Sequence, residues 1–141
     1  MKYKLWRKDK NEWEKHTWVI LPNGDLMWAE YGCLVGGVSM KNHILVKSTG
    51  INDIEGKEIY EGDIIKYWDN FDEDYKLAII KFDKGSFIMT NNIINWNIGA
   101  TNKDDKIRII GNIYENEDLL KEKLIWNLKN LKNILIVFLK N

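Results

Sequence analysis

The sequence predicts a mainly β fold of the α+β class, with antiparallel strands followed by a long amphipathic helix. Short apolar segments rich in β-branched residues recur along residues 1–113, and glycine- or asparagine-containing turn signals separate them. From Leu120 onward the leucines recur every three or four residues, which is the period of one helix face. A length of 141 residues fits one domain.

The most patterned stretch is residues 48–66, in which Gly50, Gly56 and Gly62 are spaced by six. Glycine adopts positive φ without steric cost, so this spacing predicts a series of tight turns. We expect a compact, multiply turned connection that leads into a strand over 64–68.

The N-terminal third predicts a strand over 1–7 and a hairpin over 17–30. Residues 17–21 and 26–30 are apolar, and Asn23-Gly24 lies between them. An Asn-Gly pair between apolar runs favours a type I′ turn, in which both central residues have positive φ. Residues 31–40 contain three glycines without a phosphate-binding pattern and predict a flexible loop or a bulged strand.

Further strands are expected over 43–48, 75–82, 86–90 and 107–113. Asp83-Lys84-Gly85 marks a hairpin between the second and third of these. Gly111 interrupts the last one, which indicates a bulge or a close backbone approach. Residues 91–106 are rich in asparagine and predict a loop with a short strand or turn near Trp96.

Asn116 is the expected N-cap of the C-terminal helix, with Glu117 and Asp118 in its first turn. We divide the chain into a β region over 1–115 and a helix over 116–141, both within one domain. The final turns, 134–139, are apolar on all sides and must be covered. Packing on the protein's own sheet, a two-fold mate and a membrane surface are the alternatives, and with a mate Ile134, Val137 and Phe138 would serve self-association.

The charges of the chain balance exactly, with 21 basic and 21 acidic residues, so no strong attraction to nucleic acid is built in. They are unevenly placed, because residues 49–74 hold nine acids and two lysines, a net charge of −7. These acids fit either solvated loops or an acidic face for a basic partner protein. The candidate partner-binding residues of that face are Glu55, Glu58, Glu61, Asp72, Glu73 and Asp74.

We expect no catalytic residues, metal site or cofactor. The two histidines, His16 and His43, lack metal-ligand spacing, and the single cysteine, Cys33, excludes an internal disulfide and a cysteine-based zinc site. A Cys33 nucleophile with a histidine base remains a minor alternative, since a lone cysteine is more often a small hydrophobe. With no apolar leader and no apolar run long enough to span a bilayer, the expected location is the cytoplasm.

An alternative function is the binding of single-stranded nucleic acid by an N-terminal cluster of tryptophans and basic residues. Aromatic side chains can stack on bases while nearby cations contact phosphates. The residues that would do so are Trp6, Arg7, Lys8, Lys10 and Trp13, with Lys2, Lys4, Trp18 and Trp28 nearby.

Three sequence blocks together resemble the YopX family of phages and prophages of low-GC bacteria. They are residues 4–10 (KLWRKDK), residues 48–63 with STGIND and GKEIYEGD, and residues 110–116 (IGNIYEN). The resemblance covers most of residues 2–121 and implies a mainly β fold around a small barrel-like sheet. It implies no activity and no catalytic residues, and the apolar continuation over 126–141 departs from the family's usual ending.

These observations together predict a non-enzymatic phage or prophage accessory protein. We expect it to act through contacts with another protein, a host or phage factor such as a defence component, and to form a homo-oligomer through its C-terminal helix.

Overall fold

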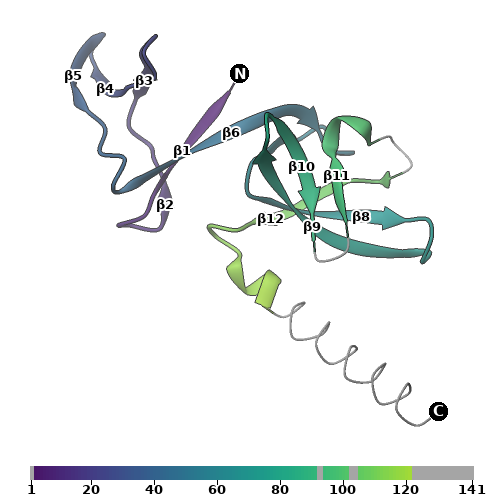
Figure 1. The fold of residues 1–141 in the computed structure, drawn as a ribbon. Helices are drawn as coiled ribbons and strands as arrows, with labels where there is room; N and C mark the ends of the chain where they lie inside the picture. The colour runs from purple at the N-terminus through teal and green to yellow at the C-terminus, as the bar shows by residue number, and fades with distance from the viewer. Residues whose placement is uncertain (1, 92–93, 102–104, 122–141) are drawn as a thin grey trace.

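The computed structural model describes residues 2–91, 94–101 and 105–121, which form three antiparallel β-sheets (Figure 1). One sheet has the order β2-β1-β6-β7, with strands Glu12–Trp13, Tyr3–Arg7, His43–Asn52 and Glu58–Tyr60. A second has the order β3-β4-β5, with strands Trp18–Ile20, Leu26–Glu30 and Cys33–Gly37. The third has the order β11-β10-β9-β8-β12, with strands Asn95–Asn97, Ser86–Thr90, Asp74–Asp83, Asp63–Asp69 and Arg108–Asn112. The mainly β prediction is confirmed.

The five-stranded sheet curls into a half-barrel whose edge strands are β11 and β12 (Figure 1). A short 3₁₀ helix, Ile98–Ala100, follows β11. At the end of the described chain, residues 117–121 are helical. The rest of the predicted C-terminal helix lies outside the described residues.

Strand β6 joins the N-terminal strands to the half-barrel because its two halves pair with different strands. His43–Lys47 pair with β1, and Ser48 and Asn52 pair with β7. Figure 1 shows β6 running from the N-terminal strands toward the half-barrel. The strand extends beyond the predicted range of 43–48, through Gly50, and its register shifts between Ser48 and Asn52.

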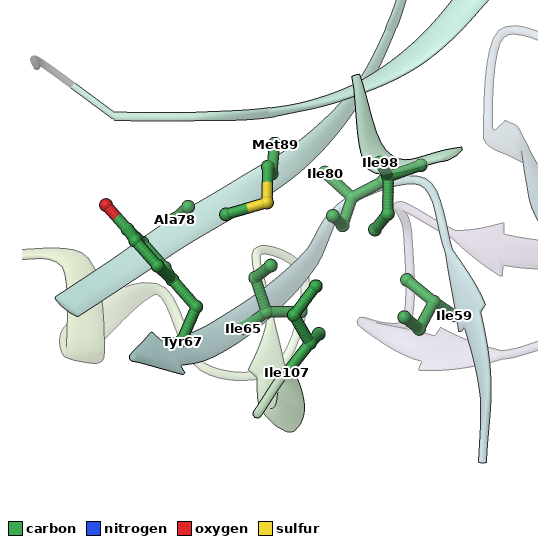
Figure 2. Close-up of a cluster of buried hydrophobic side chains, with 8 residues drawn as sticks. All are labelled: Ile59, Ile65, Tyr67, Ala78, Ile80, Met89, Ile98 and Ile107. Atoms are coloured by element: carbon green, nitrogen blue, oxygen red, sulfur yellow. The ribbon is translucent and has the colours of Figure 1, made fainter. Parts of the chain in front are cut away.

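The main hydrophobic core lies inside the half-barrel, where large side chains from β7 to β10 meet (Figure 2). Its buried members are Ile59, Ile65, Tyr67, Ala78, Ile80, Met89, Ile98 and Ile107. A second, smaller cluster of three buried side chains supports the three-stranded sheet, namely Leu5, Leu26 and Val38. The half-barrel is therefore stabilised by more buried apolar side chains than the three-stranded sheet.

Gly56 and Gly62 lie in turns as predicted, with φ of 82° and 86°. Gly50 also has a positive φ, 74°, but it lies within β6, where the register against β7 shifts, and not in a turn. The glycine-rich stretch also contains strand β7, where the sequence predicted turns. The buried carboxylate of Asp53 fixes the stretch, because its Oδ1 accepts the N–H groups of Glu55 and Lys57, both at 2.9 Å. Its Oδ2 accepts the N–H of Ile109 at 3.1 Å, which ties the turn to β12.

The predicted hairpin over residues 17–30 is present as β3 and β4, but its turn is not type I′. Gly24 has φ of 90°, while Asn23 is not among the residues with positive φ. Instead the N–H of Gly24 donates to Leu21 O at 2.8 Å, with Pro22 in the second position of the turn. Proline fixes a negative φ there and favours a type I turn closed by a left-handed glycine. The prediction overlooked this effect of Pro22.

Of the two alternatives predicted at Gly111, the bulge is present, and the residue also lies against a side chain. The register of β12 against β8 shifts between Ile109 and Gly111, which is a bulge. A Cβ at Gly111 would lie 2.6 Å from Asn116 Oδ1, so the side chain of Asn116 occupies the space that glycine leaves. The same Oδ1 accepts the N–H of Asn112 at 3.2 Å. Asn116 therefore directly precedes the helical residues as predicted, but its side chain contacts Gly111 and Asn112, which come before it in the sequence.

Candidate functional site

A cleft of about 680 Å³ lies beside the N-terminal strands and the three-stranded sheet. Arg7 comes from β1, Trp28 from β4 and His43 from β6, while Glu14, Lys15 and His16 follow β2. Side chains from four separate segments thus meet in one place, and most of them can carry charge.

Glu14 is the centre of this cleft, and its side chain is only 2% exposed. Its Oε1 lies 2.6 Å from His16 Nδ1 and accepts the N–H groups of Lys15 and His16, each at 3.0 Å. Its Oε2 lies 3.3 Å from His43 Nε2 and 3.5 Å from Arg7 Nε. Burial raises the pKa of Glu14, but these hydrogen bonds outweigh it and lower the pKa to about 2.

His43 is 8% exposed and is held at both ring nitrogens. Its Nδ1 lies 2.8 Å from Ser39 O, and its Nε2 faces Glu14. Since both neighbours are hydrogen-bond acceptors, only the doubly protonated imidazolium can donate to both. The ring of Trp28 stands edge-on to His43 and His16, with centroid distances of 5.5 Å and 6.2 Å.

The chemistry available in the cleft is that of a carboxylate paired with an accessible imidazole. The His16 side chain is 73% exposed and Glu14 fixes its Nδ1, so the pair could hold or exchange a proton. Cys33 is exposed on β5 and is not one of the residues that line the cleft. Among the described residues, no group of three or more His, Cys, Asp or Glu side chains is arranged to hold a metal ion.

A second candidate site is the β8–β9 turn, which we call the acidic tip and define as residues 69–75. Phe71 projects from it with 94% exposure. Asp69 Oδ1 accepts the N–H groups of Phe71 and Asp72, at 2.9 Å and 3.4 Å, and Lys76 pairs with Asp69 at 2.7 Å and with Asp72. Hydrogen bonds to these two carboxylates raise the pKa of Lys76, and the Lys76 contact lowers the pKa of Asp69. The turn therefore presents an aromatic ring on an internally braced loop.

The family assignment follows from sequence comparison, since the profile described as YopX protein matches residues 2–121. The chain belongs to the YopX family. The fold of this family member is similar to the crystal structure of protein yopX from Bacillus subtilis, at 24% identity and a TM-score of 0.59. The match covers 83% of this chain and 95% of that one. Protein EF1440 from Enterococcus faecalis is similar at 22% identity and a TM-score of 0.54, covering 84% and 96% of the two chains. No curated protein matches the sequence.

These identities show a shared fold and assign no activity to the YopX-family chain. Within the part of the chain that the structure describes, there is no helix with the length and apolar character needed to cross a bilayer.

The N-terminal residues proposed to bind nucleic acid are divided between the interior and the surface. Trp6 is 4% exposed and packs with Trp13 and Tyr114, at centroid distances of 5.0 Å and 5.5 Å. Arg7 is surrounded by the carboxylates of Asp9, Glu12 and Glu14. Lys8 and Lys10 are exposed. The cluster thus does not form one stacking surface, because Trp6 and Arg7 are used within the protein.

The proposed acidic face falls on two separate connections. Asp72, Glu73 and Asp74 lie on the acidic tip and are exposed. Glu55 lies before β7 and pairs with Arg108 at 3.6 Å, and Glu61 lies between β7 and β8. Glu58 is on β7, where it accepts from Ser48 at 2.8 Å and pairs with Lys2 at 3.2 Å. The proposed self-association residues Ile134, Val137 and Phe138 lie outside the described residues.

Sequence reasoning missed the Glu14 cleft entirely. The local signal was available, because Glu14 and His16 are two residues apart and could share one face of an extended segment. His43 is 29 residues from Glu14, and only the pairing of β1 with β6 brings the two together. Such a long-range contact leaves no spacing in the sequence from which to read it.

Proposed function

We propose that this YopX-family protein is a non-enzymatic phage or prophage accessory protein that binds another protein in the host cytoplasm. The acidic tip is the binding surface, and the observation that supports it is the exposure of Phe71. Burying an exposed phenyl ring against a partner protein lowers the free energy of the complex. Aromatic side chains also dominate the energetics of protein interfaces.

The charges of the tip define the partner's chemistry. Four carboxylates, those of Asp69, Asp72, Glu73 and Asp74, surround Phe71 in sequence. Lys76 pairs with Asp69 and Asp72. Among the described residues, neither Glu73 nor Asp74 takes part in an ion pair. The complementary surface is therefore an apolar pocket for the ring bordered by lysine or arginine side chains.

The bracing of the turn favours binding as well. Because Asp69 and Lys76 hold the loop in one conformation, a partner has less conformational entropy to remove when it binds. Glu58, in contrast, already has protein partners at both carboxylate oxygens, through Ser48, Lys2 and Tyr60, and contributes less to an external contact.

Affinity capture from an infected host tests this proposal, with the wild-type chain compared with Phe71→Ala and with a triple variant, Asp72→Asn/Glu73→Gln/Asp74→Asn. We expect one or more host or phage proteins on the wild type, strongly reduced on both variants, with salt reducing capture of the wild type. Tyr31→Ala is the matched control, because Tyr31 is 104% exposed but lies on a different turn. Equal capture by wild type and Phe71→Ala would overturn the proposal.

A further inference from the structure

A group of aromatic and basic side chains lies on the outer face of the half-barrel, across the neighbouring strands β12, β8 and β9. Tyr67 of β8 points into the core (Figure 2), so Lys66 and Trp68 on either side of it point to the outer face. Trp68 lies opposite Tyr75 of β9, and Arg108 of β12 lies opposite Lys66. Residues opposite one another project from the same face of a sheet. We call this surface the basic face and define it as Lys66, Trp68, Tyr75, Lys106 and Arg108.

The two aromatic rings of the basic face contact each other and two lysines. Trp68 and Tyr75 have centroids 4.9 Å apart and an interplanar angle of 73°. Lys66 Nζ lies 4.5 Å from the centroid of Tyr75, and Lys106 Nζ lies 5.3 Å from a ring of Trp68. Tyr75 is 40% exposed. Contacts between lysines and exposed rings are weak, and the lysine stem is flexible, so both ammonium groups can turn to another anion.

The positive charge of the basic face is only partly neutralised within the protein. Arg108 and Lys66 are like charges directly opposite each other, an arrangement that destabilises a strand pair. Arg108 pairs with Glu55 at 3.6 Å, and both side chains are about half exposed, at 50% and 47%. Among the described residues, no carboxylate forms an ion pair with Lys66 or Lys106. A bound polyanion would therefore relieve a repulsion that the fold leaves in place.

The acids at the end of the same hairpin point the other way. Asp69 and Asp74 lie opposite each other one position beyond Trp68 and Tyr75, so strand alternation places them on the opposite face. Lys76 shares that face and contacts Asp69 at 2.7 Å. A chain with no net charge thus separates its charges across one hairpin, and an anion can approach the basic face from the side away from these acids.

We propose that the basic face binds single-stranded nucleic acid, with a base stacked on Trp68 or Tyr75 and phosphates held by Lys66, Lys106 and Arg108. Aromatic rings among cations suit unpaired bases, because every base has a π-face and every nucleotide carries a phosphate. The bases of a duplex already stack on their neighbours, so a duplex would use the cations alone. This surface is not the N-terminal cluster predicted from the sequence, and the proposal is independent of the role of Phe71.

Fluorescence anisotropy with a labelled oligothymidine of about 16 nucleotides tests stacking, since small single-strand-binding folds cover up to about that length. We expect wild type to bind at low salt. Trp68→Leu keeps an apolar side chain but removes the stacking surface, and it should weaken binding by about fivefold or more. Tyr31→Leu is the matched control and should bind as wild type does, because Tyr31 is an exposed aromatic residue on a different turn.

The salt dependence of binding tests the phosphate contacts and involves no change in the aromatic rings. Each phosphate contact to a single strand contributes about 0.7 to the slope of log affinity against log salt. The double variant Lys66→Gln/Lys106→Gln should therefore lower the magnitude of this slope by about 1.4. Lys8→Gln/Lys10→Gln is the matched control, because it removes two exposed lysines of the N-terminal cluster and should leave the slope unchanged.

Four results would overturn the proposal. They are no binding of oligothymidine by wild type at low salt, wild-type affinity in a folded Trp68→Leu, an unchanged salt slope in Lys66→Gln/Lys106→Gln, and equally tight binding of oligothymidine paired with oligoadenine. Polyglutamate of equal charge should compete poorly, because it offers no base to stack. Equal competition by polyglutamate would show that the face reads charge alone, as for an acidic protein, and would also overturn the proposal.

Discussion

Glu14 stabilises the folded protein through its charge, because three cationic or potentially cationic side chains and two backbone N–H groups face one buried carboxylate. An isolated charge at this depth would destabilise the fold by several kcal/mol. Its partners reverse that balance, so the pKa is lowered to about 2. The network links β1 and β6 to the segment that enters the three-stranded sheet.

Replacing Glu14 by Gln should therefore cost stability in a pH-dependent way. A folded pKa of about 2 against an ordinary value of 4.5 means that the stabilisation is fully present above pH 4.5 and is lost as the pH falls toward 2. At neutral pH we expect Glu14→Gln to lower the free energy of unfolding by about 3 kcal/mol, measured by urea unfolding. Glu12→Gln is the control and should cost less than about 1 kcal/mol, because Glu12 is 43% exposed. A wild-type minus Glu14→Gln difference that is the same at neutral and acidic pH would contradict this account.

Asp63 behaves in the opposite way, because burial dominates over its hydrogen bond from the Tyr60 N–H at 2.8 Å and raises its pKa to about 6. Because the pKa of Asp63 is raised in the folded state, the contribution of its protonated carboxyl to stability is fully present below about pH 3.8. That contribution is lost as the pH rises through about 6. Asp63→Asn keeps an oxygen acceptor and removes the buried charge. We expect its advantage over wild type to grow by up to about 3 kcal/mol between acidic and neutral pH in urea unfolding. Asp74→Asn changes an exposed carboxylate and serves as the control, and parallel pH profiles for Asp63→Asn and wild type would refute the prediction.

At this scale, the sequence predicts residues whose role is local. The glycines at 50, 56 and 62 are recognisable because positive φ selects them, whatever surrounds them. The Glu14 network is not recognisable, since its members acquire their roles only when the pairing of β1 with β6 places His43 beside Glu14. The same holds for Trp6, whose aromatic ring is equally suited to stacking on a base or to packing on Tyr114.

Among the elements, hairpins show how a single residue changes a turn. Residues 83–86 form the tight turn that glycine signals predict, with φ of 48° at Lys84 and 81° at Gly85. At residues 21–25 the same kind of signal leads to a different turn because Pro22 restricts φ. Both hairpins pair the strands that were expected, so pairing is predicted more reliably than turn type.

The bulge in β12 and the turn that follows it form another unit, which depends on Gly111. Gly111→Ala would place a Cβ 2.6 Å from Asn116 Oδ1, and we expect it to lower the free energy of unfolding by about 1–3 kcal/mol in chemical denaturation. Gly37→Ala is the matched control, because no atom lies within 4 Å of its added Cβ. Adding Asn116→Ala to Gly111→Ala should recover part of the loss. If Asn116→Ala lowers the free energy of unfolding by the same amount in wild type and in Gly111→Ala, the two residues do not interact.

Across the whole molecule, the two hydrophobic clusters differ in size, and this difference sets where the fold opens first. The half-barrel buries eight side chains in one cluster, whereas the three-stranded sheet rests on Leu5, Leu26 and Val38. The exposed Ile20, Tyr31, Leu34, Val35 and Met40 all lie on or next to that sheet. Regions with few buried apolar contacts open at lower free energy than the rest of a protein.

Native-state hydrogen exchange should therefore resolve two units of different stability. Amides of β3 and β4 are expected to exchange through local openings, and those of β8 to β10 only through openings near the global free energy. Leu26→Ala removes a buried side chain of the small cluster and should lower the opening free energy of β3 and β4 by about 2–4 kcal/mol, leaving β8 to β10 unchanged. Ile80→Ala, at the centre of the large cluster, should lower the protection of β8 to β10 by a similar amount. Equal losses in both sheets for Leu26→Ala would mean that β6 couples them into one cooperative unit, because the strand that pairs with both β1 and β7 would then transmit the loss from one cluster to the other.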